Sequence, residues 1–332
     1  MNKKKIFVTG GAGYVGSYLV QELLEKGHNV TVYDTMFFGS DFFPKSDKLK
    51  VIKGDIRDQK KLSESCKDHE IFLHLACISN DASYELDENL SKTINFDCFE
   101  PMVILAKKAG IRRFIYASSS SVYGVSDQKD VKEDHPLLPL TLYNKFKGMC
   151  EPILLNHTDD NFEGVIFRPA TVCGYAPRLR LDLSVNILTN HAYNKNKITV
   201  FGGDQLRPNL NVKDYSAVVD LLINAKKELV QNEIFNVGYE NMSIIQLAKL
   251  VKDIFKERYS KEVEIVRTES NDNRSYHINS DKIYNKLKFK PTHSINDAIN
   301  SLLDAFEANK IPNSFEDDIY FNVKRMQNLK VK

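Results

Sequence analysis

The sequence has no tryptophan and only five cysteines among its 332 residues. The cysteines are odd in number and include no C-x-x-C pair: Cys66, Cys77, Cys98, Cys150 and Cys173. This pattern indicates scattered buried thiols in a reducing compartment, not a disulfide framework. We therefore expect a cytoplasmic protein with no metal site.

Long apolar runs and an excess of one charge are also missing. No apolar stretch approaches the length needed to cross a bilayer. Net charge is +2 with Lys and Arg spread along the chain, unlike the clustered basic face of a nucleic-acid binder. Lys3 to Lys5 precede Ile6-Phe7-Val8, but this apolar run is too short for a secretion signal and enters glycines directly. We expect no membrane or nucleic-acid partner.

The first 120 residues alternate short β-rich runs with amphipathic helical stretches. Helices are predicted over 16–26, ended by Gly27, and over 96–109. Strands are predicted between and around them, over 6–9, 29–33, 50–53, 70–76 and 113–117. This repetition predicts an α/β fold, a doubly wound Rossmann sheet of parallel strands with helices on both faces.

The second half is less regular and predicts a smaller α/β substrate-binding lobe. Ser243 to Gln246 and Ser294 to Asp297 each read as a capping box that opens a helix. We expect an NAD-binding domain over 1–172, to which 211–240 return, and a lobe formed by 173–210 and 241–332. The polar and basic end, Asn322 to Lys332, is expected to be loosely held.

The turn after the first strand has the composition of a dinucleotide site. Thr9 to Gly16 reads T-G-G-A-G-Y-V-G, so side chains are absent where a backbone must approach a pyrophosphate at a helix N-terminus. A plain strand-to-helix turn is the alternative. However, Asp34 ends the second strand, about 20 residues on, where a carboxylate accepts hydrogen bonds from ribose hydroxyls and repels the 2′-phosphate of NADP. NAD is the predicted cofactor.

Tyr143 and Lys147 are four residues apart, which puts them on one face of a helix. A phenol with a pKa near ~10 is a poor base at neutral pH, and a neighbouring ammonium together with a nicotinamide cation favours the phenolate. The run Ser118 to Ser121 follows a predicted strand, so a hydroxyl there lies at the same edge of the sheet. Alone, Y-x-x-x-K is equally typical of a surface tyrosine and a solvated lysine; the combination favours a catalytic set.

Together these motifs resemble the extended short-chain dehydrogenases/reductases, in particular the UDP-galactose 4-epimerase and nucleotide-sugar 4,6-dehydratase group. The resemblance covers roughly residues 5–305 in the family's order. It rests on these segments: Thr9 to Gly16, Asp34, Gly54 to Ile56, His74 to Ala76, Asn95, Ser118 to Gly124, Tyr143 to Lys147, Phe167 to Pro169, Arg207 to Asp214 and Arg274 to Tyr276.

The resemblance implies a catalytic set of Ser119, Tyr143 and Lys147, with Ser119 bonding the C4 oxygen of the sugar beside Tyr143. It also implies that Asp55 and Ile56 hold the adenine and that Asn95 braces the nearby sheet. The full set of implied cofactor-binding residues is Gly10, Gly13, Tyr14, Val15, Gly16, Asp34, Asp55, Ile56, Leu75, Ala76, Asn95, Tyr143, Lys147 and Pro169.

For the substrate, the resemblance implies that Arg207 and Arg274 clamp a diphosphate, because guanidinium geometry suits phosphate oxygens. A solvated surface position is the alternative for Arg178 and for Arg180. The full set of candidate substrate-binding residues is Ser79, Asn80, Ser119, Ser120, Arg178, Asn186, Arg207 and Arg274. The runs around Ser79 and Ser275 resemble bacterial surface-sugar enzymes and suggest a GDP-linked hexose or heptose.

Departures from the family pattern restrict the reaction. The 4,6-dehydratases and decarboxylating relatives carry an acid two places before the V-Y-G tyrosine, whereas this chain has Ser121. A hydroxyl of ordinary pKa cannot serve that elimination, so a dehydratase is disfavoured. Phe146 replaces a small residue, Asn211 a frequent histidine and Arg168 a frequent asparagine. These differences leave C4 oxidation intact but depart from the galactose epimerase pocket.

The expected reaction is NAD-dependent oxidation of a C4 hydroxyl to a 4-keto nucleotide sugar, in the synthesis of surface polysaccharide. If the ketone takes hydride back on its other face, the protein is a 4-epimerase; if the ketone leaves, it is a 4-dehydrogenase. A non-catalytic NAD-binding module is the alternative from another class. Relatives pair through the helices after Asn95 and around Tyr143, so the resemblance implies a homodimer.

Overall fold

The structure, a computed structural model, describes residues 3–79, 87–126, 128, 130–269, 275 and 277–331. Its large sheet is entirely parallel, in the order β10-β6-β5-β4-β1-β2-β3. The strands are β1 (Lys5–Thr9), β2 (Asn29–Asp34), β3 (Leu49–Lys53), β4 (Ile71–His74), β5 (Arg113–Ala117), β6 (Glu163–Pro169) and β10 (Glu233–Val237). The predicted doubly wound α/β sheet is confirmed.

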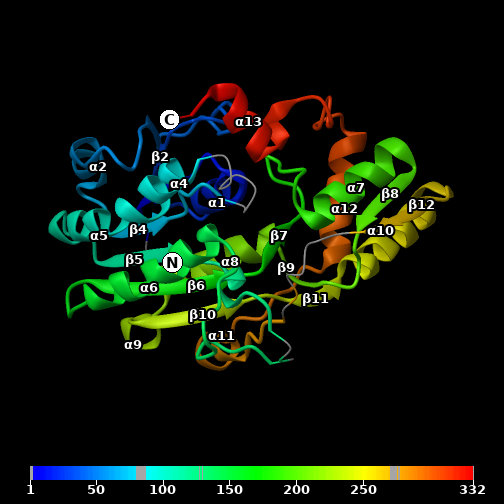
Figure 1. Cartoon of the computed structure of the whole chain (residues 1–332). Coiled ribbons are helices and arrows are strands. Elements are labelled where there is room, and N and C mark those ends of the chain that lie inside the picture. Colours follow the sequence, from blue (N-terminus) through cyan, green and yellow to red (C-terminus); the bar gives the residue numbers. More distant parts are fainter. Residues whose placement is uncertain are drawn as a thin grey trace.

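Helices cover both faces of this sheet, because its central strands are apolar on both sides. Ile6 and Val8 of β1 pack into the cluster formed with α1 (Tyr14–Glu25) and α8 (Val212–Asn224). Phe7, between them, packs into the opposite cluster. That second cluster is completed by α2 (Gln59–Cys66), α5 (Phe99–Lys108) and α6 (Leu142–Asn156). Figure 1 shows these layers.

Two predicted helices have different bounds in the structure. Helix α1 begins at Tyr14, not at residue 16, because Gly13 is extended (φ −80°, ψ −176°) and serves as the N-cap. The helix predicted over 96–109 is the last part of a longer helical stretch. It follows α4 (Glu88–Lys92) and a π-helical turn, η1 (Thr93–Asp97).

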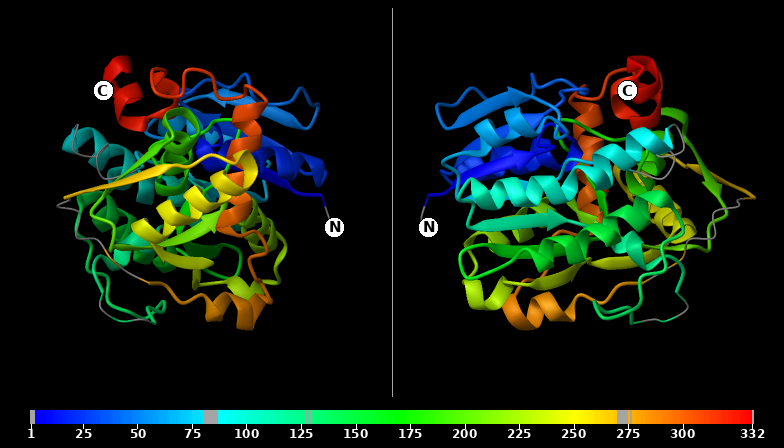
Figure 2. Two further views of the ribbon diagram at one scale, coloured as in Figure 1. Left: turned by 90° about the vertical axis from the view of Figure 1, so that its right-hand side faces the viewer. Right: turned by 60° about the vertical axis from the view of Figure 1, so that its left-hand side comes forward.

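The remaining strands form two small sheets beside the carboxyl ends of the large one. The sheet β11-β9-β7 comprises β7 (Thr171–Cys173), β9 (Leu206–Asn211) and β11 (Glu240–Ser243). The second sheet pairs β8 (Lys197–Phe201) with β12 (Glu264–Thr268). They pack with α7 (Ser184–Lys195), α10 (Ile244–Tyr259) and α12 (Ile295–Glu307), as Figure 2 shows. Both predicted capping boxes, at Ser243 and Ser294, are present.

The chain's last helix, α13 (Asn322–Leu329), lies across the top of both parts (Figure 1). Asn322 and Met326 are buried, and the Arg325 Nε donates to the main-chain oxygen of Phe37 over 2.8 Å. The expectation of a loosely held end over 322–332 is therefore wrong for α13. Shorter elements are η2 (Ser120–Tyr123), α9 (Lys227–Val230), α11 (Asp281–Leu287) and η3 (Asp318–Tyr320). Within the described residues, no helix is both long and apolar enough to span a bilayer.

Candidate active site

The turn between β1 and α1 is built for close approach of another backbone. Gly10 has φ +76°, and a Cβ there would lie 2.4 Å from the nitrogen of Ala76. A Cβ on Gly16 would lie 2.5 Å from the oxygen of Gly11. Within the described residues, no side chain caps the N-terminus of α1, so its first amides are left for a ligand. This cradle fits the diphosphate of a dinucleotide.

Asp34 ends β2 directly beside that cradle. Its carboxylate accepts hydrogen bonds from the amides of Ala12 (3.0 Å) and Met36 (2.9 Å). Burial raises the pKa of Asp34, while these two amides oppose the shift. The guanidinium of Arg57 binds Asp55, the Nη2 nitrogen lying 2.6 Å from Oδ2. These contacts fit a ribose, and they tie Arg57 to Asp55 and not to a 2′-phosphate.

A cavity of about 740 Å³ runs from this cradle to α6 and into the smaller sheets. Most of the predicted site residues line it: Gly10, Gly13, Tyr14, Val15, Asp34, Asp55, Ile56, Leu75, Ala76, Ser79, Ser119, Ser120, Tyr143, Lys147, Pro169, Arg178 and Arg207. Gly16, Asn95 and Asn186 do not. Asn80 and Arg274 lie outside the described residues.

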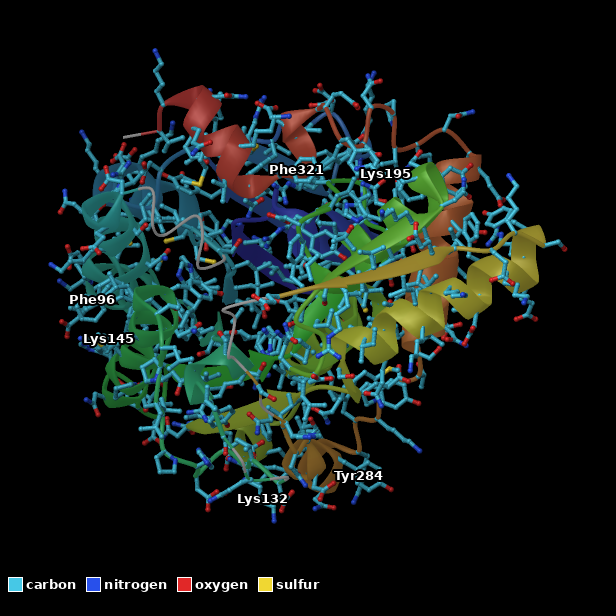
Figure 3. All side chains as sticks on the ribbon, turned by 45° about the vertical axis from the view of Figure 1, so that its right-hand side comes forward. Phe96, Lys132, Lys145, Lys195, Tyr284 and Phe321 are labelled. Carbon is cyan, nitrogen blue, oxygen red and sulfur yellow. The ribbon has the colours of Figure 1, made fainter. Side chains whose placement is uncertain are left out.

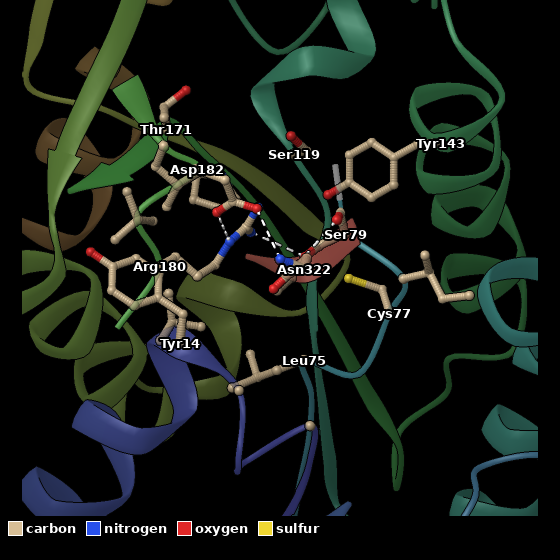
Figure 4. Close-up of a pocket in the computed structure, with 18 of the residues that line it drawn as sticks. Tyr14, Leu75, Cys77, Ser79, Ser119, Tyr143, Thr171, Arg180, Asp182 and Asn322 are labelled. Atoms are coloured by element: carbon tan, nitrogen blue, oxygen red, sulfur yellow. Dashed lines mark hydrogen bonds and ion pairs between the residues drawn. The ribbon is translucent and has the colours of Figure 1, made fainter. Parts of the chain in front are cut away.

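Tyr143 and Lys147 lie one turn apart on α6, which begins where Thr141 accepts a hydrogen bond from the amide of Asn144. Figure 4 shows the hydroxyl end of Tyr143 directed into the cavity, with Ser119 beside it. Lys147 is buried, and its Nζ donates to the oxygen of Ala117 over 2.6 Å. The cavity therefore brings together the predicted phenol, ammonium and hydroxyl.

Ser119 belongs to a short chain of hydroxyl contacts. Its Oγ lies 2.7 Å from Oγ of Ser121, which in turn donates to the amide oxygen of Asn144 over 2.5 Å. Asn144 is buried next to Tyr143 on α6. The place that holds an acid in dehydratases is thus taken by a hydroxyl that positions Ser119.

A buried ion pair between Arg168 and Glu151 lies next to these residues. Arg168 donates to both carboxylate oxygens of Glu151, at 2.9 Å from Nε and 2.6 Å from Nη2. Glu151 also accepts from the hydroxyl of Ser118 over 2.6 Å. Because Glu151 follows Lys147 by one turn of α6, the pair joins the Tyr143 helix to the serine run and β6.

The profile of the NAD dependent epimerase/dehydratase family matches residues 6–238. The chain belongs to this family. The predicted NAD-dependent enzyme is therefore confirmed, and the alternative of a non-catalytic NAD-binding module is not supported.

The chain's relatives in this family carry the names of enzymes that act on nucleotide sugars. It is 30% identical to the UDP-glucose 4-epimerase of Lactobacillus helveticus over 278 residues, 75% of this chain and 82% of the relative. It is 29% identical to the UDP-N-acetyl-alpha-D-glucosaminuronate decarboxylase of Bacillus cytotoxicus over 274 residues, 78% and 81% of the two chains. The UDP-glucose 4-epimerase of Thermotoga maritima, solved with UDP-glucose, has a TM-score of 0.82 at 24% identity, covering 92% of this chain and 99% of that one. This last likeness concerns the fold alone.

Asn95 and Asn186 form side-chain hydrogen bonds within the protein. The Asn95 side chain accepts from the amide of Ile78 (2.9 Å) and donates to its oxygen (3.0 Å). Asn95 therefore braces the loop after β4, whereas the sequence predicted that it braces the sheet. Asn186 is fully buried, accepting from the amide of Gly174 and donating to Tyr14 Oη and to the oxygen of Arg180. That placement makes Asn186 a support of the cavity wall.

Several cavity residues, among them Arg180, Asp182 and Asn322, were not among the predicted site residues. Arg178 and Arg180 are both buried, so the surface alternative for them is wrong. Arg180 binds Asp182 through Nε (2.8 Å) and Nη2 (3.1 Å) and Ser79 through Nη1 (3.1 Å). Asn322 reaches the same wall from α13 (Figure 4). The signal for Asp182 was its spacing two residues after an arginine; none pointed to Asn322.

The cysteines follow the predicted pattern of buried thiols only in part. All five cysteines are free, four of them buried, whereas Cys77 is partly exposed and lines the cavity. Within the described part of the chain, no cluster of His, Cys, Asp or Glu has the arrangement of a metal site.

Proposed function

We propose that the protein oxidises the C4 hydroxyl of a nucleotide sugar to a ketone and returns hydride to the other face, as a nucleotide-sugar 4-epimerase. The observation that carries this proposal is the meeting of Tyr143, Ser119 and Lys147 at one cavity, with Ser121 as a hydroxyl partner of Ser119. Two UDP-glucose 4-epimerases among the relatives at 30% identity support it.

In this mechanism Tyr143 accepts the proton of the C4 hydroxyl, and Ser119 holds the same oxygen by a hydrogen bond. Lys147, one turn further along α6, supplies the positive charge that favours the phenolate. Bound NAD supplies the hydride acceptor. Return of the proton from Tyr143 accompanies reduction of the ketone, so the enzyme's residues end in their starting state.

The absence of an acid at position 121 argues against loss of water from the sugar. Elimination requires a group that gives or takes a proton near neutral pH, and a serine hydroxyl does not ionise there. Ser121 is instead committed to Ser119 and Asn144. A 4,6-dehydratase therefore remains the disfavoured alternative.

Substrate binding is assigned to the wall nearer the small sheets. Arg207 of β9 lines the cavity, as do Ser79, Ser120 and the first residue of α7, Ser184. Within the described residues, no side chain caps the N-terminus of α7, so its amides suit an anion. We propose that Arg207 and this N-terminus bind the substrate diphosphate. Arg274, predicted to share that task, lies outside the described residues.

The proposed domain boundaries follow the sheets. All strands of the large sheet lie in residues 1–172 and 211–240, which we assign to the NAD-binding domain. Residues 173–210 and 241–332 form the substrate-binding lobe. A role in surface polysaccharide synthesis in the cytoplasm, with a GDP-linked sugar as one candidate substrate, belongs to the same proposal.

The test is incubation of purified enzyme with a panel of GDP-, UDP-, CDP- and dTDP-sugars, followed by NMR of the products. Inversion at C4 is expected; a released ketone would indicate a 4-dehydrogenase, and a 4-keto-6-deoxy product would overturn the proposal. Tyr143→Phe should retain NAD and lose at least about 100-fold in kcat. Tyr284→Phe is the matched control, because Tyr284 is half-exposed on α11 and far from the cavity (Figure 3).

We also propose a homodimer that pairs through η1, α5 and α6. Phe96 of η1 stacks on Phe146 of α6, with ring centroids 5.3 Å apart, and Met149 nearby is 38% exposed. Figure 3 places Phe96 and Lys145 at the same edge of the molecule. Light scattering should give a dimer for the native chain and a monomer for Met149→Glu.

A further inference from the structure

Arg178 is an interior cation at the wall of the cavity. Its side chain is buried, and the carbon at the centre of its guanidinium lies 3.5 Å from the centroid of the Phe38 ring. Its main-chain amide donates to Ser17 Oγ on α1 over 3.1 Å. The Nη2 nitrogen donates to the amide oxygen of Asn322 over 2.5 Å. Phe38 and Asn322 therefore hold the guanidinium in place, while Ser17 fixes the main chain of Arg178.

The positive charge of Arg178 has no direct ion pair within the described residues. Its Nε is buried without a hydrogen-bond partner, and none of the ion pairs of the described chain includes it. The nearby carboxylate of Asp182 is already bound by Arg180. Burial, and then the charge of Arg180, lower the pKa of Arg178. A buried cation in these surroundings is stabilised by an anion that enters the cavity.

The position of Arg178 along the cavity identifies that anion. Phe38, four residues after Asp34 at the proposed ribose end, lies against the guanidinium of Arg178, and all three side chains line the cavity. Arg180, two residues further along the chain, lines the cavity together with Tyr143 at the proposed reaction end. The N-terminus of α1, which no side chain caps within the described residues, contributes Gly13, Tyr14 and Val15 to the same stretch of cavity. In a dinucleotide, the group between the adenosine ribose and the nicotinamide ribose is a diphosphate.

We propose that Arg178 binds the diphosphate of NAD, opposite the N-terminus of α1. The sequence suggested a substrate contact for Arg178, but its contacts are Ser17 in the first turn of α1, Phe38 and Asn322. Because Arg178 lies between β7 and α7, the cofactor is held from both parts of the molecule. Binding of the cofactor then stabilises the segment that leads into the substrate-binding lobe.

The test compares Arg178→Gln and Arg178→Lys with the native enzyme after nucleotide removal. Calorimetry with NAD should show an affinity about 10- to 100-fold weaker for Arg178→Gln, as expected for a lost charge-assisted contact. Arg178→Lys should recover part of this loss, because the charge is retained. Adenosine, which has no phosphate, should bind native and variant enzymes equally when followed by saturation-transfer NMR.

The control is Arg207→Gln, a change on β9 at the proposed substrate diphosphate, which should weaken binding of the UDP- or GDP-sugar and leave NAD affinity unchanged. Loss of sugar-nucleotide binding with unchanged NAD affinity in Arg178→Gln would return Arg178 to the substrate and overturn the proposal. Equal loss of adenosine and NAD would overturn it as well. The apo variant should melt at or above the native temperature, since an unpaired buried charge is gone. A lower melting point with an undiminished NAD-induced increase would assign Arg178 to the fold alone.

Discussion

Nζ of Lys147 donates a hydrogen bond to the main-chain oxygen of Ala117, 2.6 Å away. The contact joins the middle of α6 to the last residue of β5, immediately before the serine run. The same ammonium lies 4.9 Å from the ring centroid of Tyr116. The charge that serves Tyr143 is therefore held by the sheet itself.

Lys147→Met should lower kcat by about 100-fold or more at neutral pH, because proton transfer would rely on a phenol of ordinary pKa near ~10. Residual activity should rise with pH up to that range. A pH profile of kcat measures both effects. Lys145→Met, two residues away and exposed on the same helix, should match the native enzyme. A native kcat in Lys147→Met would contradict the assigned role.

Breaking the Arg168–Glu151 pair should be costly, since it leaves one buried charge without a partner. Arg168→Met is expected to lower the free energy of unfolding by about 3–5 kcal/mol. Adding Glu151→Leu should restore much of this, which urea unfolding can measure. Arg258→Met, in the more exposed pair with Glu307, should cost about 1 kcal/mol or less. Equal losses in the single and double variants would refute the argument.

Asn322→Ala should loosen the cofactor. It removes the acceptor of Arg178 and a 3.0 Å donor to Ser79 Oγ. The increase in melting temperature caused by saturating NAD should therefore shrink, because that increase reports affinity for the folded state. Gln327→Ala, on the exposed side of α13, is the control. If both variants respond to NAD as the native enzyme does, α13 has no part in cofactor binding.

Acid should destabilise the protein partly through His74. Burial, and then the charge of Lys147, hold the pKa of His74 well below 6.5. Below pH 6.5 the unfolded chain takes up a proton that the folded chain does not. The free energy of unfolding then falls with decreasing pH, by up to about 1.4 kcal/mol per pH unit. Urea midpoints between pH 7.5 and 5.5 should show a smaller slope for His74→Gln, and equal slopes would contradict the prediction.

The sequence predicted the large sheet and its cofactor cradle because their signals are local. The alternation around Phe7, the glycines from Gly10 to Gly16 and the carboxylate at Asp34 lie within one strand–helix–strand unit. The proposed catalytic pair could be predicted equally well, since Tyr143 and Lys147 are separated by a single helical turn. Such features depend on neighbours in sequence, which periodicity and spacing report.

The wall formed by Arg178, Arg180 and Asn322 could not be predicted in this way. Asn322 contacts Arg178 although 144 residues separate them in the sequence. The residues that flank an arginine do not indicate whether its side chain is solvated or buried. The end of the chain was misjudged for the same reason. Its polar composition indicates exposure, whereas two inward-facing positions, Asn322 and Met326, are enough to dock it.

The position of β10 at the edge of the large sheet has a consequence for biosynthesis. β10 pairs with β6, yet the chain builds β7, β8 and β9 before it arrives. The apolar face that α8 covers stays open to solvent until residue 224 has left the ribosome, and β6 presents an unpaired edge until residue 237 has followed. Completion of the proposed NAD-binding domain therefore waits for residues 173–210, the first segment of the proposed substrate-binding lobe, to be translated. A truncated nascent chain should be an aggregation-prone client of chaperones.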